Sequence, residues 1–291
     1  MGLPWIDHEA WSVVDEVSDA LRRDVARLLT EADAEELRAT RNAQIAAFTL
    51  SLVAWRAAQQ AGLRSELVAA FAGHSLGEYT ALVGAGALDT VSASHLVAAR
   101  GDAMQAAADA SPGTMVAVLG LDADEVAQAC EGLDDAWPAN DNAPGQVVVA
   151  GTAHGVACAE EAVIARGAKR VMALAVGGAF HSPLMAGAQA NLDAALDTCR
   201  FEPTLTPVVA NVDAKPHRDG FAGLLSRQLA SRVRWRESLL ELAGMGVTTF
   251  VELGPGAELS GMVKRTVNGA MRANVASPGD LDKLAELLPT L

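Results

Sequence analysis

The segment from residue 67 to residue 84 constrains the fold more than any other part of this 291-residue chain. An apolar run, LVAAFAG, leads directly into GHSLGEYTALVG, whose composition favours a helix. Gly73 and Gly77 flank Ser75 in the pattern G-x-S-x-G, which is typical of a sharp turn from a strand into a helix, where the backbone is too crowded for larger residues. We therefore predict a buried parallel strand, a tight turn and a helix with the Ser75 hydroxyl at its N-terminus.

This pattern alone does not decide what Ser75 does. In a chain rich in Ala and Gly, G-x-S-x-G also arises where a serine merely caps the N-terminus of a helix. As a nucleophile, Ser75 needs a neighbouring base, because a serine hydroxyl is weak unless another group takes its proton during attack. The other motifs of the chain have to separate the two interpretations.

Around this segment the pattern predicts an α/β fold with two parts. Residues 8–62 are helical in pattern, with no strand among them. Residues 114–176 alternate short strands and helices in the order βαββαβ, which is typical of a ferredoxin-like unit. TPVVANVDA and GVTTFVELG then resume a parallel sheet. We expect a large domain from residues 1–112 and 178–291, and a small inserted domain from residues 113–177.

Composition excludes several classes of partner. With 22 basic and 36 acidic residues the formal charge is −14, which argues against nucleic acid or an anionic membrane surface as the main partner. No segment has the roughly 18 to 20 apolar residues of a membrane span. Cys130, Cys158 and Cys199 lie far apart without a C-x-x-C pair, so we expect a reducing compartment, the cytoplasm, and no metal site.

Six segments together carry a resemblance to a known family. They are GHSLGEYTALVGAGALD (73–89), LVAARGDAMQ (96–105), NAPGQVVVAG (142–151), GAFHSPLM (178–185), NVDAKP (211–216) and VELGPGAELSGMVKR (251–265). In order and spacing they resemble malonyl-CoA:acyl-carrier-protein transacylases and the acyltransferase domains of polyketide synthases. The resemblance covers nearly the whole chain. It implies an α/β-hydrolase-like large domain with a parallel sheet, and an inserted ferredoxin-like small domain.

The resemblance assigns the catalytic groups. Ser75 would be the nucleophile, His181 its general base, and the backbone N–H of Leu76 a donor to the oxyanion. A capping role for His181 before Pro183 is the competing interpretation. The order Ser then His suggests a dyad, in which a backbone carbonyl near residues 253–256 would orient the imidazole. Asp213 is the alternative orienting group.

Four further residues are assigned to substrate binding by the same resemblance. Arg100 would grip the free carboxylate of the malonyl group with two parallel hydrogen bonds, although a helix-surface arginine is the ordinary alternative. Phe180 would fill the space that an α-methyl group needs, which favours malonyl over methylmalonyl. Asn142 would line the acyl or pantetheine path or simply form a turn before Pro144. His74, whose side chain diverges from Ser75 in such a turn, is placed in this set too.

The activity implied is transfer of a malonyl group from malonyl-CoA to the phosphopantetheine thiol of an acyl carrier protein, through a malonyl-Ser75 ester and ping-pong kinetics, with no cofactor. A serine thioesterase or other hydrolase is one alternative. A catalytically impaired relative that binds carrier protein is a second alternative. Family members begin with a strand running into a G-Q-G-S-Q loop that contributes an oxyanion donor, and this sequence shows neither the strand nor the loop. Either the true start lies upstream, which the intact remaining motifs favour, or the chain is such an impaired relative. Loss of a central strand would expose a sheet edge and apolar surface.

One basic stretch could receive an acidic carrier protein. Residues 227–236 hold four arginines and no acid, whereas the chain as a whole is acidic. A solvated helix end balanced by Glu237 and Glu241 is the equally weighted alternative.

Overall fold

The computed structural model describes residues 1–288. Its helices are α1 (Ser12–Leu21), α2 (Val25–Thr30), α3 (Ala34–Arg38), α4 (Thr40–Gln60), α5 (Gly77–Gly84), α6 (Thr90–Ala110), α7 (Ala123–Cys130), α8 (Ala153–Ala165), α9 (Ala186–Leu196), α10 (Phe221–Leu229), α11 (Trp235–Gly244), α12 (Glu258–Thr266) and α13 (Leu281–Leu287). Its strands are β1 (Phe71–Ala72), β2 (Thr114–Leu119), β3 (Ala136–Ala143), β4 (Gln146–Gly151), β5 (Arg170–Ala173), β6 (Val208–Val209), β7 (Pro216–His217), β8 (Thr249–Leu253) and β9 (Met271–Val275).

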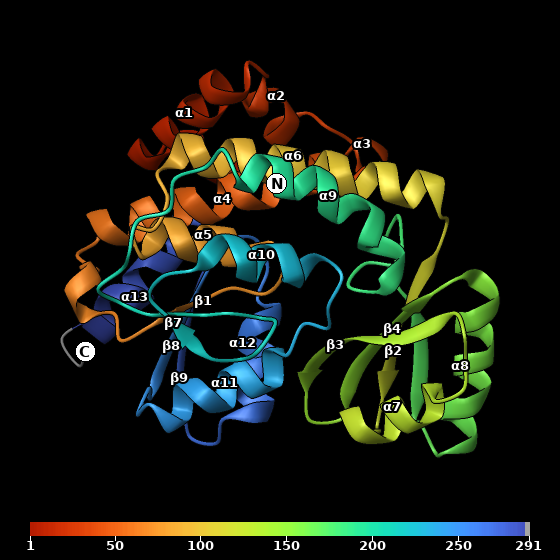
Figure 1. The fold of residues 1–291 in the computed structure, drawn as a ribbon. Helices are drawn as coiled ribbons and strands as arrows, with labels where there is room; N and C mark the ends of the chain where they lie inside the picture. The colour runs from red at the N-terminus through yellow and green to blue at the C-terminus, as the bar shows by residue number, and fades with distance from the viewer. Residues whose placement is uncertain (289–291) are drawn as a thin grey trace.

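A helical layer built on the long helices α4 and α6 covers the larger part of the molecule (Figure 1). Helix α4 is buried over most of its length because its apolar residues occur on several faces, among them Phe48 and Val53. Helix α6 begins where the Asp89 side chain accepts a hydrogen bond from the Ser92 amide, which satisfies one of the free N–H groups of its first turn. Helices α1 and α9 pack against α6 and bury its other sides.

The strands of the larger part form two short sheets. Strands β1 and β6 pair in parallel and β7 adds antiparallel, while β8 and β9 form a separate parallel pair. The strand predicted over residues 67–73 is much shorter than expected, because only Phe71–Ala72 pairs and Ser65–Leu67 forms a 3-10 turn. The apolar side chains of this run mostly line a groove, which is why their pattern suggested a longer buried strand.

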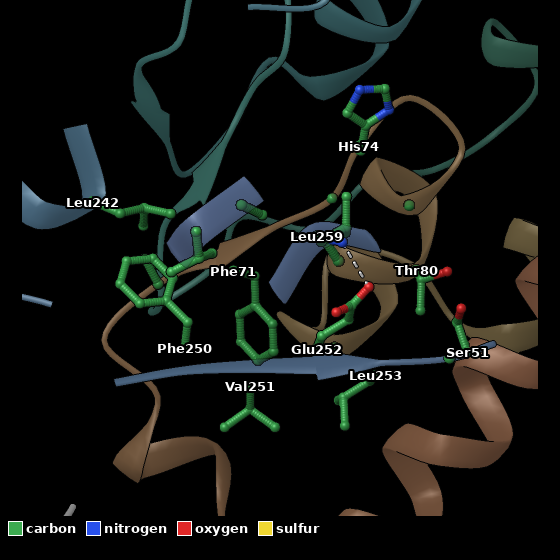
Figure 2. A pocket seen from close by; sticks show the side chains of 18 of the residues that line it. Ser51, Phe71, His74, Thr80, Leu242, Phe250, Val251, Glu252, Leu253 and Leu259 are labelled. Carbon is green, nitrogen blue, oxygen red and sulfur yellow. Dashed lines mark hydrogen bonds between the residues drawn. The ribbon is translucent and has the colours of Figure 1, made fainter. Parts of the chain in front are cut away.

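That groove separates β1 from β8. It has a volume of about 660 Å³ and is lined by apolar residues of both strands and of the helices above and below them, including Phe48, Phe71, Val251 and Leu259. Figure 2 shows β8 along one side of the groove and the chain from Phe71 to His74 along the other. Strands β1 and β8 are each at the edge of their sheet, so an open edge and apolar surface meet at this groove, as loss of a central strand would produce.

The smaller part follows the predicted βαββαβ order. Its four strands form an antiparallel sheet in the order β3-β4-β2-β5, and α7 and α8 pack against each other and against this sheet. Alternate side chains of β2 and β4 face opposite ways: Val116 and Val147 pack in the core formed with the helices, and Met115 and Val148 pack with Ala179. The predicted fold class is confirmed, and we propose residues 113–177 as the small domain.

Strand β3 connects the two parts. The Asp141 amide donates to the Val233 carbonyl across 2.9 Å, and the Val233 amide donates to the Ala139 carbonyl across 2.8 Å. The carboxylate of Asp141 also pairs with Arg236 of α11. Within residues 1–288, no helix combines the length and the apolar character that crossing a membrane requires.

Candidate active site

Ser75 lies in a strained turn between β1 and α5. Its φ of 51° is left-handed, a conformation that residues other than glycine rarely adopt. Gly73 is required here, because a Cβ added to it would lie 1.9 Å from the backbone carbon of Gly77. Asn211 stabilises the turn from the side: its Oδ1 accepts from the Ser75 amide at 2.6 Å, and its Nδ2 donates to the Gly73 carbonyl at 2.7 Å. The sequence-predicted turn is present at the predicted residues.

His181 lies beside the Ser75 hydroxyl, although 106 residues separate them in the chain, with 2.6 Å between Nε2 and Oγ. On the other side of the ring, Nδ1 is 3.0 Å from the backbone carbonyl of Gln228. A carbonyl can only accept, so we assign the ring proton to Nδ1, which leaves the Nε2 lone pair facing the hydroxyl. Burial and, to a lesser degree, the positive charge of Arg100 lower the pKa of His181 to about 3. The imidazole is therefore neutral and able to accept a proton.

The orienting carbonyl differs from both predictions. Residues 253–256 do not contact His181 through any hydrogen bond of the described chain, and Asp213 instead pairs with His217 at 3.0 Å. Gln228 can serve because it lies in the last turn of α10, where its carbonyl accepts from amides just past the helix, such as that of Ser231 at 3.3 Å, and has a second lone pair for the imidazole. A carbonyl belongs to every residue, so no residue type in the sequence marks this one.

Arg100 is buried in the same cluster, with 1% of its surface exposed. Its guanidinium donates to the Ser75 hydroxyl at 2.9 Å, to Gln44 Oε1 at 2.6 Å and to Gln228 Oε1 at 3.2 Å, and it lies 5.6 Å from the centre of the Tyr79 ring. Desolvation lowers the pKa of Arg100, but a guanidinium stays protonated near neutral pH. The alternative of a helix-surface arginine is wrong, since the side chain points into the site.

The backbone N–H of Leu76 has no hydrogen-bond partner within residues 1–288. It follows Ser75 directly and stands at the N-cap of α5, where the helix dipole favours negative charge. The position suits a donor to an oxyanion formed next to Ser75.

His74 and Asn142 contact each other. His74 Nε2 lies 2.8 Å from Asn142 Oδ1, and the imidazole packs edge-on against Trp235 with 5.6 Å between ring centres. Burial lowers the pKa of His74. Because Asn142 belongs to β3, this contact joins the small sheet to the turn that holds Ser75. Phe180 precedes His181 and is partly buried where the cores of the two parts meet.

The arginines of residues 227–236 are largely paired within the chain. Arg232 and Arg234 both contact Glu237, and Arg236 contacts Asp141 at 3.0 Å. These pairs favour a balanced surface over a free basic patch.

Sequence reasoning missed four supporting residues: Gln44, Glu78, Asn211 and Gln228. Glu78 and Asn211 lie inside quoted motifs, and their polarity within apolar surroundings was the available signal. Gln44 and Gln228 lie in stretches that read as ordinary amphipathic helix.

Comparison with known proteins relates the whole chain to acyltransferases. The family model described as "Acyl transferase domain" matches residues 7–284. Malonyl CoA-acyl carrier protein transacylases of Bacillus subtilis and Escherichia coli K12 are each 40% identical over 277 residues, covering 93% and 94% of this chain and 86% and 89% of theirs. The crystal structure of the acyl-carrier-protein S-malonyltransferase of Burkholderia pseudomallei superposes with a TM-score of 0.93 at 38% identity, covering 98% of this chain and 94% of that one. A malonyl-transacylase in complex with a type II PKS acyl-carrier protein gives a TM-score of 0.90 at 37% identity, covering 95% and 91%.

Proposed function

The chain belongs to the acyl transferase domain family, and on that premise we propose that it transfers a malonyl group from malonyl-CoA to the thiol of an acyl carrier protein. The observation that carries the proposal is one cluster: the Ser75 hydroxyl lies 2.6 Å from His181 Nε2 and 2.9 Å from the Arg100 guanidinium. It joins a nucleophile, a base and a carboxylate receptor. We place the reaction in the cytoplasm.

In the first step Ser75 becomes acylated. His181 Nε2 takes the hydroxyl proton while Oγ attacks the thioester carbon of malonyl-CoA. The carbonyl oxygen becomes an oxyanion, to which the Leu76 N–H can donate. When the carbon–sulfur bond breaks, His181 returns the proton to the coenzyme A thiol. The product is a malonyl-Ser75 ester and a neutral imidazole.

In the second step the carrier protein takes the acyl group. Its phosphopantetheine thiol gives its proton to His181 Nε2, and the sulfur attacks the ester carbon of malonyl-Ser75. Collapse of the tetrahedral intermediate releases Oγ, which recovers the proton from His181. The same groups serve both half-reactions, so ping-pong kinetics follow.

Arg100 provides the preference for a malonyl group. Its buried guanidinium can exchange the Ser75 hydroxyl and the glutamine oxygens for a carboxylate, which makes stronger, charge-assisted hydrogen bonds. We propose that Phe180 limits substitution at the α-carbon, and that His74 and Asn142 line the path of the acyl or pantetheine chain. A thioesterase for uncharged acyl groups would not gain from a buried arginine.

The test is to incubate the protein with radiolabelled malonyl-CoA, isolate the labelled peptide, and then add carrier protein bearing phosphopantetheine. We expect label on the peptide that contains Ser75, followed by transfer to the carrier. Ser75→Ala should remove the label, while Ser111→Ala, which changes an exposed serine at the end of α6, should not. Label released to water at the same rate with and without carrier would show a hydrolase. Absence of label in the unaltered protein would show a non-catalytic binding protein.

A further inference from the structure

Glu78 is a buried carboxyl group that the reaction above does not use. It lies in the first turn of α5, three residues after Ser75, and 2% of its surface is exposed. One of its oxygens, Oε2, accepts two hydrogen bonds: from the Asn211 amide at 2.9 Å and from Gln228 Nε2 at 3.0 Å. Burying a carboxyl group is costly unless such donors surround it.

Both partners of Glu78 already support the catalytic pair. The Asn211 side chain holds the backbone of the Ser75 turn, and the Gln228 carbonyl orients His181. The Gln228 side chain makes further contacts: Nε2 donates to the Ser75 carbonyl at 2.9 Å and Oε1 accepts from Arg100 at 3.2 Å. A single carboxylate oxygen thus connects the support of the nucleophile with the support of the base.

We propose that Glu78 is a positioning residue for the transfer reaction, whose negative charge holds Gln228 and Asn211 and thereby sets the geometry between Ser75 and His181. The proposal rests on the proposed function. Charge-assisted hydrogen bonds are about twice as strong as neutral ones, so the ionised form fixes Gln228 more firmly than the protonated form. In the protonated form, the left-handed turn at Ser75 is held less tightly.

The surrounding charges determine where this group titrates. Burial raises the pKa of Glu78 to about 7, and the negative charge of Asp213 after β6 adds to this rise. The hydrogen bonds from Gln228 and Asn211 and the positive charge of Arg100 on α6 oppose it. Tyr79, the next residue, stays protonated because burial raises its pKa. His181 does not titrate near neutrality, since its pKa is about 3. Burial also lowers the pKa of His74 below its usual 6.5, so a loss of acylation centred near pH 7 would originate from Glu78 and not from either imidazole.

The experiment measures the single-turnover rate of Ser75 acylation by malonyl-CoA from pH 5 to pH 8.5. We expect the unaltered protein to lose rate as pH falls through about 7. Glu78→Gln should react about tenfold more slowly at pH 8, because about this factor in rate is lost when one charge-assisted hydrogen bond becomes neutral. Its rate should not fall further at low pH, so the variant should lack this acid limb of the profile. The half-saturating concentration of malonyl-CoA should stay constant, because Glu78 does not touch the substrate. Glu78→Asp should keep an acid limb.

The matched control is Glu252→Gln on β8, where a carboxylate accepts from the amides of Leu259 and Ser260 at 3.0 and 2.7 Å but contacts neither Gln228 nor Asn211. It should keep the profile of the unaltered protein. An acid limb that persists in Glu78→Gln would overturn the proposal. A flat pH profile in the unaltered protein would also overturn it, and that result does not depend on whether a variant folds. Absence of any acylation in the unaltered protein would instead refute the proposed function.

Discussion

The Arg100 guanidinium and the Ser75 hydroxyl are 2.9 Å apart, so the receptor for a carboxylate and the nucleophile share one small space. A substrate that occupies both must carry its carboxylate close to the carbon that Ser75 attacks. In a malonyl thioester a single methylene separates these two groups. The contact therefore selects a short acyl chain with a terminal carboxylate. Two glutamine oxygens accept from the terminal nitrogens of the guanidinium, whereas its Nε–H has no hydrogen-bond partner among the described residues.

Replacing Arg100 should separate malonyl transfer from acetyl transfer. Arg100→Ala removes the donors to the substrate carboxylate, and we expect kcat/KM for malonyl-CoA to fall about 100-fold or more. Acetyl-CoA lacks that carboxylate, so its lower rate should change much less. Steady-state rates with both substrates at equal carrier concentration provide the measurement. An equal loss for both would mean that Arg100 serves the fold or Ser75 and does not select the acyl group.

The sequence predicts the site best where function depends on side-chain identity within a local motif. Ser75 and Gly73 follow from the crowding of one turn, and Arg100 and His181 follow from motifs of the family. The carbonyl that orients His181 could not be predicted in this way, because it depends on where the last turn of α10 lies in space and not on the side chain of Gln228.

The short β1 illustrates a second limit of the sequence. An apolar run records burial without saying which element provides it, and residues 67–70 face a groove between two sheets where a strand was expected to continue. The ferredoxin-like unit was predicted correctly because each of its strands pairs within about sixty residues, so turns and alternation along the chain specify the sheet.

Replacing Phe180 should relax the preference at the α-carbon of the acyl group. Phe180→Ala removes a partly buried ring next to His181, which leaves room for an α-methyl group. We expect the ratio of methylmalonyl to malonyl transfer to rise about 10- to 200-fold, the usual range for one methyl group in an apolar pocket. Phe201→Ala is the control, since that ring packs on Phe221. A similar ratio in both variants would show that Phe180 does not limit the acyl group.

The free energy of unfolding should fall as Glu78 ionises with rising pH. Its pKa is 4.5 when unfolded and about 7 in the native protein, so the native state binds more protons between these values. The stability contributed by the protonated group is fully present below about pH 4.5 and is lost as pH rises through about 7. Relative to the unaltered protein, Glu78→Gln should therefore gain up to about 3 kcal/mol of unfolding free energy between pH 4.5 and pH 8.

Urea unfolding at both ends of that range measures this difference. His181 titrates in both proteins and cancels in the comparison, whereas Glu252→Gln should show no such gain. A difference that stays constant with pH would contradict the raised pKa. The charge that orders the site above pH 7 therefore lowers the stability of the native state.

The groove between β1 and β8 has two open strand edges. The Thr248 carbonyl and the Gly254 amide make hydrogen bonds to β9. Because backbone groups alternate in direction along a strand, those of Thr249, Val251 and Leu253 point away from β9 and toward the groove. Residue numbers rise from left to right along both strands in Figure 2. Residues of α4, α5, α11 and α12 line this gap. A parallel strand with apolar side chains on both faces would fit between them.

The first helical turn of the chain contacts the residue that follows β9. Trp5 Nε1 donates to the Ala276 carbonyl at 3.0 Å, directly after the carboxyl end of β9. We therefore predict that an apolar strand followed by Gly-Gln-Gly-Ser-Gln, fused ahead of Met1, enters the groove and brings a second backbone donor to the oxyanion. One such donor changes turnover by about 10²- to 10³-fold, so Ser75 acylation should accelerate by a factor in that range. The control fusion carries proline in the middle of the strand, which cannot donate to either edge. Equal acylation rates for the two fusions, together with unchanged hydrogen exchange at Val251, would show that the groove does not accept a strand.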